Sequence, residues 1–193
     1  MKKNITISVL MTIVTTVLLG LIYPLAMTAL SQLLFRDKAD GQLIVRDGNV
    51  IGSRIIGQPF TGPGYFHSRP SAAGSGYDAA NSGGTNLGPT NQKLIDRVKQ
   101  SSASLQPENL NAPVPIDLVT TSASGLDPDV TPAAAYFQVP RVSRERHLPE
   151  DQLRGLVGRH ITSRQMGFLG EPRVNVLELN LALDLLSTST TKR

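Results

Sequence analysis

Residues 4–35 contain no Asp, Glu, Lys, Arg or His, and this uncharged run constrains the fold more than any other feature of the chain. A helix needs about 20 predominantly apolar residues to cross a hydrocarbon core of roughly 30 Å, and the run is longer than that. Because the bilayer core offers no water to backbone groups, a single span must be helical. The sequence therefore predicts one membrane-spanning helix, with Ile5, Leu10 and Leu34 among its residues.

Two polar features mark this helix. Thr6, Thr12, Thr15 and Thr16 are spaced so that each hydroxyl can bond back to a carbonyl of its own helix. Pro24 lacks an N–H, and its ring pushes on the carbonyl of Gly20, four residues earlier. We expect a kink in the helix at that point.

The apolar run could instead be a cleaved signal peptide or a buried core helix. A signal peptide has an apolar region of about 7–15 residues and a cleavage site of small residues, and residues 26–28 offer only a poor version of such a site. A core helix is less favoured, because nothing later in the chain is apolar enough to surround it. We expect an uncleaved anchor.

The charges that flank the span predict its orientation. Lys2 and Lys3 precede it without acidic neighbours, whereas the basic residues that follow it alternate with acidic ones: Arg36, Asp37, Lys38 and Asp40. Positive charge is retained on the cytoplasmic side of a membrane. The sequence therefore predicts a cytoplasmic amino terminus, an anchor over residues 1–36 and one extracytoplasmic domain over residues 37–193.

Composition limits what this domain can be. The chain has 193 residues and no Cys, which excludes disulfides, thiolate nucleophiles and cysteine zinc sites. Its 17 Gly and 13 Pro, with aromatic residues at only 5%, predict many turns and little regular structure. A net charge of +4 does not indicate nucleic acid binding, because an extracytoplasmic domain does not meet nucleic acid. We expect one loop-rich α+β domain.

The first half of the domain combines a hairpin with a long loop. Over residues 42–60, β-branched residues flank Asp47-Gly48, a pair that favours a tight hairpin turn, and Gly52-Ser53 are expected to interrupt the second strand. Residues 57–91 show no periodicity but carry aromatic residues, which predicts an ordered binding loop. Thr90 is expected to cap a helix that ends near Ser104.

The second half is expected to alternate helices and strands. Residues 116–120 have strand character, Thr131-Pro132 predicts a helix start, and Pro140 is expected to interrupt that helix. Another helix should begin within residues 148–151, where acidic residues occupy the first turn. Residues 174–186 fit a strand followed by a helix, with polar groups of Asn175 and Asn180 turned outward, and residues 187–193 form a frayed tail.

Three kinds of chemistry can be considered and are not favoured. The Gly-rich residues 83–88 lack the lysine of a phosphate-binding loop, since the next lysine is Lys93. Ser124 with Asp127 and a histidine (His67, His147 or His160) could form a hydrolase triad, but no G-x-S-x-G motif is present. Asp127 and Asp129 could hold a hard cation, although two carboxylates around a proline more often cap a turn. We predict no catalytic, cofactor-binding or metal-binding residue.

Several polar and aromatic residues are instead candidates for a subunit interface, because core packing does not explain them. They lie in the long loop, in a Ser-Gly-Leu-Asp turn and directly after Pro140: Tyr65, His67, Arg69, Tyr77, Asp78, Asn86, Ser124, Asp127 and Arg141. For His67 and Arg69, holding their own loop through backbone carbonyls is favoured over anion binding. The basic residues after position 140 could form either a solvated face or a docking surface.

Long motifs cover nearly the whole chain and include Gly-Gln-Pro-Phe at 57–60, Tyr-Phe-His-Ser-Arg-Pro at 65–70, Gly-Gly-Thr-Asn-Leu-Gly-Pro-Thr-Asn at 83–91, and the segments 122–128, 138–142 and 167–184. In order and spacing, these motifs resemble the C subunit of the Kdp potassium-transporting ATPase. Asp129, often His in that family, and residues 159–166 depart from the pattern.

The resemblance implies a non-catalytic subunit of the bacterial inner membrane. Such a subunit works with a channel-like potassium-binding subunit and a P-type ATPase subunit, and the ATPase subunit uses the ATP and Mg²⁺. Two roles are implied for it, namely assembly of the complex near the extracytoplasmic entrance and a chaperone-like increase in ATP affinity. The alternatives are an anchored periplasmic serine hydrolase that uses Ser124 and a stand-alone binding module.

Overall fold

The computed structural model describes residues 1–190, and their side chains as far as Leu186. The chain divides into two compact units, which meet between Ile51 and Gly52.

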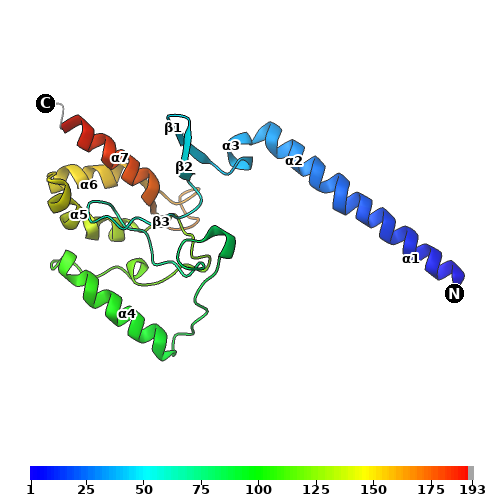
Figure 1. Cartoon of the computed structure of the whole chain (residues 1–193), viewed down its shortest axis with the longest axis horizontal. Coiled ribbons are helices and arrows are strands. Elements are labelled where there is room, and N and C mark those ends of the chain that lie inside the picture. The colour runs from blue at the N-terminus through cyan, green and yellow to red at the C-terminus, as the bar shows by residue number, and fades with distance from the viewer. Residues whose placement is uncertain (191–193) are drawn as a thin grey trace. The chain divides into compact units, whose positions relative to one another are not determined.

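The first unit begins with one continuous apolar helix over Lys2–Leu34 (Figure 1). It consists of α1 (Lys2–Thr15), the π-helical segment η1 (Thr16–Ile22) and α2 (Tyr23–Leu34), and none of its side chains is buried. By length and composition this helix can cross a membrane, as the sequence predicted. Thr6, Thr12 and Thr15 donate to helix carbonyls at 2.8–3.1 Å, which confirms the expected back-bonding for these three residues.

The helix continues through Pro24, and the turns that precede the proline are of the wider π-helical type. Pro24 is the second residue of α2 and directly follows the π-helical turns of η1. A proline removes one backbone donor and crowds the preceding turn, and π-helical turns provide more room for the displaced carbonyls. The apolar helix therefore continues beyond the proline to Leu34.

A short helix α3 (Arg36–Ala39) is followed by a hairpin of β1 (Leu43–Arg46) and β2 (Asn49–Ser53). Asp47 and Gly48 both have positive φ, at 52° and 78°, as a tight primed turn requires. The predicted hairpin is confirmed. The expected interruption of the second strand is wrong, because β2 continues through Gly52 and ends at Ser53.

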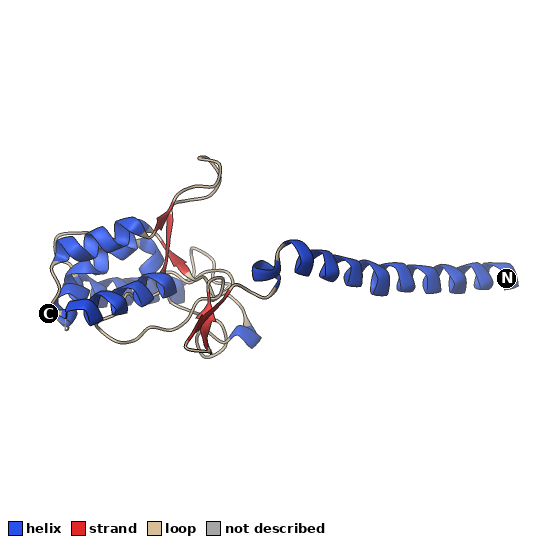
Figure 2. Cartoon of the chain, turned by 90° about the horizontal axis from the view of Figure 1, so that it is seen from above, coloured by secondary structure: helices blue, strands red, loops and turns tan. Residues whose placement is uncertain are grey.

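The second unit packs three helices against a small antiparallel sheet. The helices are α5 (Pro132–Arg146), α6 (Glu150–Arg159) and α7 (Val176–Thr190), and the strands β3 (Asp129–Val130), β4 (Ile161–Thr162) and β5 (Arg173–Asn175) lie in the order β3-β5-β4. α5 packs on α6, and α6 on α7. Figure 2 shows how short the strands are beside the helices and loops. The core includes Phe66, Phe137, Val139, Leu153, Val157, Val174, Leu179 and Leu183.

Several predicted boundaries are confirmed in this unit. Thr131 caps α5 by accepting from the Ala134 N–H at 3.1 Å, with Pro132 at the first helical position. α6 begins at Glu150, with acidic residues in its first turn. Residues 174–186 form the end of β5 and then α7, as expected. The predicted frayed tail is wrong for residues 187–190, because they continue α7, and residues 191–193 lie outside the described residues.

Two predicted helix limits are wrong. The cap of α4 (Gln92–Leu105) is Asn91 rather than Thr90, and its side-chain oxygen accepts from the Lys93 N–H at 2.9 Å. α5 continues through Pro140 to Arg146. A proline inside a helix costs about 3 kcal/mol, but Val139 and Val142 on either side are completely buried, and that burial offsets the cost.

The predicted strand over residues 116–120 is also wrong, because Ile116–Leu118 forms the 3₁₀ helix η4. Asp117 is buried and accepts from the Thr131 N–H at 2.7 Å and from the Thr131 hydroxyl at 3.2 Å. This contact holds the segment against the start of α5. A strand would alternate its side chains between two faces, whereas here the Asp117 carboxylate must point inward to reach the cap of α5.

Asn180 was expected to face outward and instead lies in the core, with 1% of its surface exposed. The loop over residues 57–91 is irregular, as predicted, with the short 3₁₀ helix η2 (Ala79–Asn81) inside it. The contacts that order this loop involve most of the candidate interface residues.

Candidate functional site

The aromatic part of the long loop is attached to two helices by buried side-chain amides. Asn180 on α7 bonds both the N–H and the carbonyl of Phe66 at 2.9 Å. Gln138 on α5 does the same for His67, accepting from its N–H at 2.7 Å and donating to its carbonyl at 3.1 Å. Phe66 itself is completely buried. This stretch of the loop is therefore part of the core.

Tyr65 and its neighbours join the loop to the two helices from the outside. The Tyr65 hydroxyl donates to the Asp184 carboxylate at 3.3 Å, and the same carboxylate pairs with Arg146 at 2.9 Å. The Arg146 guanidinium lies over the Tyr65 ring, 4.3 Å from its centroid. Cation, ring and carboxylate thus form one cluster that stabilises the loop.

Arg141 is a structural residue inside the domain, with 8% of its surface exposed. It pairs with Glu108 at 2.7 Å and donates to the carbonyls of Pro63 and Tyr65 and to the Gln138 side chain. A buried arginine needs such partners to compensate its lost hydration. Core contacts therefore account for this candidate interface residue.

His67 also holds its own loop. Its Nε2 donates to the Gly62 carbonyl at 3.0 Å, which sets the neutral tautomer because that carbonyl only accepts. Burial and the nearby Arg141 charge lower the pKa of His67 below 6.5. The expectation that His67 pins the loop through a backbone carbonyl is confirmed.

Arg69, Asp127 and Tyr77 form a second cluster between the loop and the turn at 122–128. Arg69 pairs with Asp127 at 3.0 Å and donates to the Thr121 carbonyl at 3.4 Å, as expected for a residue that holds its loop. The Tyr77 hydroxyl donates to the Arg69 carbonyl, and burial raises the pKa of Tyr77 above 10.0. The structure therefore brings Asp127 of the turn next to Arg69 and Tyr77 of the loop, although 58 positions separate Arg69 and Asp127 in the sequence.

The remaining candidates are Ser124, Asp78 and Asn86. The Ser124 hydroxyl accepts from the Leu126 N–H at 3.1 Å, and its carbonyl accepts from the Gly83 N–H at 2.9 Å. Asp78 caps η2, and its bond with Asn81 lowers the pKa of its carboxyl. Asn86 is exposed in a left-handed conformation, with φ of 52°. Of the nine candidates, Ser124 and Asn86 are the exposed ones.

The possible hydrolase triad is not assembled. Asp127 bonds Arg69 and the Asp129 N–H, while the Ser124 hydroxyl bonds within its own turn. His67 and His160 each bond a backbone carbonyl, of Gly62 and Leu156 respectively. No contact joins these groups into a nucleophile–base pair within the described residues, so the hydrolase alternative is not favoured.

The two carboxylates considered for a cation are also occupied. Asp127 pairs with Arg69, and Asp129 pairs with Arg173 at 2.9 Å. Burial nevertheless raises the pKa of Asp129 above 3.8. Across residues 1–190, no group of three or more His, Asp or Glu side chains could hold a metal ion. These carboxylates serve ion pairs inside the domain.

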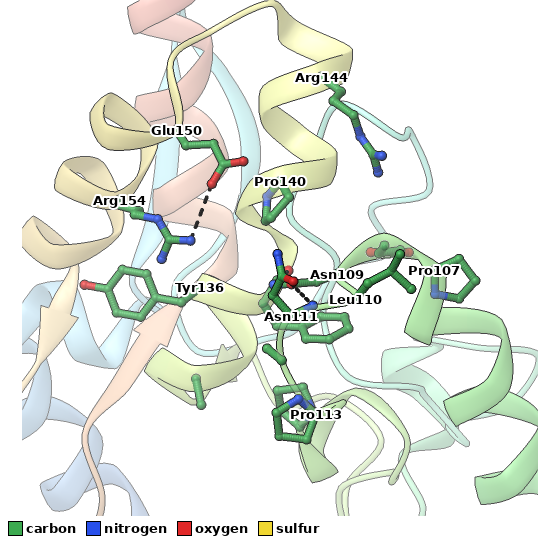
Figure 3. A pocket seen from close by; sticks show the side chains of 15 residues that line it. Pro107, Asn109, Leu110, Asn111, Pro113, Tyr136, Pro140, Arg144, Glu150 and Arg154 are labelled. Atoms are coloured by element: carbon green, nitrogen blue, oxygen red, sulfur yellow. Dashed lines mark hydrogen bonds and ion pairs between the residues drawn. The ribbon is translucent and has the colours of Figure 1, made fainter.

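A groove of about 570 Å³, which the sequence did not indicate as a site, lies between α5, α6 and the turn that follows η3 (Gln106–Glu108) (Figure 3). Its walls combine polar side chains with apolar ones, and the apolar ones include several prolines: Pro107, Leu110, Ala112, Pro113, Pro115, Phe137 and Pro140. Arg144 and the Glu150–Arg154 ion pair, at 3.4 Å, lie on its rim. Such a groove is suited to binding, and the clustered prolines were the signal available in the sequence.

The comparisons with known proteins identify the family of the chain. Residues 5–185 match the family model described as KdpC: K+-transporting ATPase, c chain. The chain belongs to the KdpC family. The family expected from the sequence motifs is thereby confirmed.

Relatives across the KdpC family match the chain over nearly its whole length. A potassium-transporting ATPase KdpC subunit of Koribacter versatilis is 72% identical over 95% of both chains. The corresponding subunit of Acidobacterium capsulatum is 61% identical over 92% of this chain and 95% of its own. That of Methylobacterium nodulans is 53% identical over 97% and 99%. Each of these relatives is named as the KdpC subunit of a potassium-transporting ATPase.

Proposed function

We propose that this chain is the membrane-anchored accessory subunit of an ATP-driven potassium importer, and that it assembles and stabilises a channel-like subunit and a P-type ATPase subunit. The observation that carries the proposal is the helix Lys2–Leu34, which is predominantly apolar, carries no charge after Lys3 and buries none of its side chains within the chain. A subunit that must be held beside membrane partners needs such a helix, with small and hydroxyl residues available for packing.

The charges near the helix ends support an extracytoplasmic domain in the inner membrane. Lys2 and Lys3 have no acidic neighbour, whereas Arg36 pairs with Asp40 at 3.7 Å. Asp40 also accepts from the Gln32 side chain at 2.9 Å. The positive charge beyond the span is thus largely neutralised, and the orientation with a cytoplasmic amino terminus follows.

With the domain outside, the subunit acts on potassium's entrance and binds no ATP, Mg²⁺ or nucleic acid itself. ATP and Mg²⁺ belong to the ATPase partner. The chaperone-like increase in ATP affinity must then be indirect, transmitted through the membrane helices. The ion pairs of Arg69 and Arg141 support this division of roles between the two subunits, because both arginines are used to order the domain.

Mild-detergent purification of the tagged full chain from its own host tests the assembly. A channel-like subunit and an ATPase should copurify with it, and deletion of residues 2–34 should release both. Ser124→Ala should leave growth at limiting potassium unchanged. Copurification of neither subunit would overturn the proposal, and loss of growth in Ser124→Ala with a folded protein would revive the hydrolase alternative.

The orientation has a separate test, made simple by the absence of cysteine. Ser75 is exposed, whereas the Ser71 hydroxyl is bonded to the Gly125 carbonyl at 2.6 Å, so Ser75→Cys is the better probe. An impermeant thiol reagent should label Ser75→Cys in intact spheroplasts and label Asn4→Cys only after lysis. The reverse pattern would place the domain in the cytoplasm.

A further inference from the structure

Between β4 and β5, the chain presents three apolar side chains to solvent within four residues. Met166 is 85% exposed, Phe168 is 70% exposed and Leu169 is 48% exposed. Single exposed apolar residues are ordinary, but a cluster at a protruding tip is typical of an interaction site. Residues 165–169 form this apolar tip.

The apolar tip is held in one conformation by its own backbone. Gln165 and Leu169 exchange both of their backbone hydrogen bonds at 2.9 Å, which closes a tight turn. Met166 and Gly167 have positive φ, at 51° and 83°, so both central residues adopt the left-handed conformation. At the base, Arg164 pairs with Glu171 at 3.0 Å.

The backbone conformation of the apolar tip costs free energy, and packing within the domain does not offset that cost. A left-handed backbone is unfavourable for Met166, and a side chain that is 85% exposed gains little from packing within the domain. A rigid loop that presents Met and Phe is instead suited to binding, since ordering it in advance removes an entropic cost of association. Met and aromatic side chains are also enriched at the centres of protein interfaces.

We propose that the apolar tip is an anchor that inserts into an apolar pocket on a partner protein of the potassium-transporting complex. The proposal rests on the proposed function, because it names the surface through which the domain joins that complex. Phe168 and Met166 supply the buried contact, and the Gln165–Leu169 pairing fixes their direction.

Two observations favour a protein pocket over the lipid surface. A fluid bilayer does not require one fixed side-chain direction, whereas a preformed pocket does. A loop that binds anionic lipid also carries unpaired basic residues, but Arg164 at the base of the tip is neutralised by Glu171. The charge at the tip therefore matches an apolar protein pocket.

Photo-crosslinking in native membranes tests the proposal. The full-length chain would carry benzoylphenylalanine at position 168, with Ile116 as the matched control, since Ile116 is 72% exposed on η4. We expect an adduct at position 168 with a subunit that copurifies as part of the complex, at least about tenfold stronger than at position 116. An adduct with lipid alone, equal adducts at both positions, or no adduct at position 168 would each overturn it.

A pair of variants gives an independent readout. In the purified complex, Met166→Ser/Phe168→Ser should speed exchange of the chain against labelled wild type by about tenfold, as expected for a central anchor, while Ile116→Ser should not. The melting temperature of the full chain should stay the same, because both tip side chains are exposed. Unchanged exchange would refute the tip as an anchor while copurification still upholds the proposed function.

Discussion

The side-chain amide of Asn180 on α7 bonds both backbone groups of Phe66, at 2.9 Å each, across 114 positions of sequence. It thereby reproduces, with a side chain, the paired bonds that a neighbouring strand would provide. Phe66 can be completely buried in a loop only because its N–H and carbonyl have these partners. The long loop is ordered by this contact and by its counterpart between Gln138 and His67.

Replacing the amide should release the loop. Asn180→Leu keeps similar volume but leaves the Phe66 N–H and carbonyl without partners, which costs about 1–3 kcal/mol for each buried group. We expect the free energy of unfolding to fall by about 2–5 kcal/mol, measured by denaturant titration of the full chain in detergent. Gln100→Leu, at an exposed position of α4, should change it by less than about 0.5 kcal/mol, and equal effects would refute this account.

Removal of the buried Arg141 should be more damaging than removal of a surface charge. Arg141→Met leaves Glu108 without its partner at a site where the arginine side chain is 9% exposed, and we expect a loss of about 3–5 kcal/mol. Adding Glu108→Gln should restore part of that loss. By contrast, Glu150→Gln breaks an ion pair that is nearly half exposed and should cost less than about 1 kcal/mol. Thermal melts of these three variants and the wild type would show the difference.

Stability should decrease as the pH falls below 6.5, because of His67. Burial and the Arg141 charge lower the pKa of His67 in the folded protein, so the unfolded chain binds the proton more readily. The stability that neutral His67 contributes is complete above 6.5 and is lost as the pH falls from there toward the folded pKa. His67→Gln, which can still donate to the Gly62 carbonyl, should flatten the pH dependence measured by denaturation.

Gly125 lies where the long loop meets the turn at 122–128, and it has two reasons to be glycine. Its φ is +67°, and an added Cβ would lie 2.6 Å from the Ala73 nitrogen and 2.7 Å from the Gly83 carbonyl oxygen. Gly125→Ala should therefore lower the melting temperature much more than Gly167→Ala. Gly167 has φ of +83° but open space around it, so its alanine variant should lose only about 1–2 kcal/mol from backbone strain. Similar losses in the two variants would show that the backbone conformation alone matters.

Local patterns predicted the elements whose cause is local. The uncharged run predicted the apolar helix, Asp47-Gly48 predicted the hairpin turn, and Thr131-Pro132 predicted the start of α5. The predicted interruption of α5 at Pro140 was wrong, because the energetic cost of the proline is local, while the burial that offsets it comes from contacts with other helices. The strand expected around Asp117 failed in the same way, since the partner of that carboxylate is Thr131.

The candidate interface residues show the same difference between local patterns and contacts with distant residues. Polar residues such as His67, Arg69 and Arg141 could not be assigned to core packing from their types, because polar side chains are buried only where distant partners satisfy them. Their partners are Gly62, Asp127 and Glu108, and the distance in sequence to the last two is 58 and 33 positions. The sequence did not predict the apolar tip, since two residues, Met166 and Phe168, are too few to form a pattern.

The sequence by itself determined that the chain has one apolar helix, a loop-rich α+β domain and the motifs of the KdpC family, since these depend on composition and on order along the chain. The tertiary structure decided which polar residues are internal and which surface remains for a partner. Asn180 became a core residue because it satisfies Phe66, and the tip of Met166 and Phe168 stayed exposed because nothing in the domain covers it. Burial is a property of the folded chain, and contacts between distant residues set it.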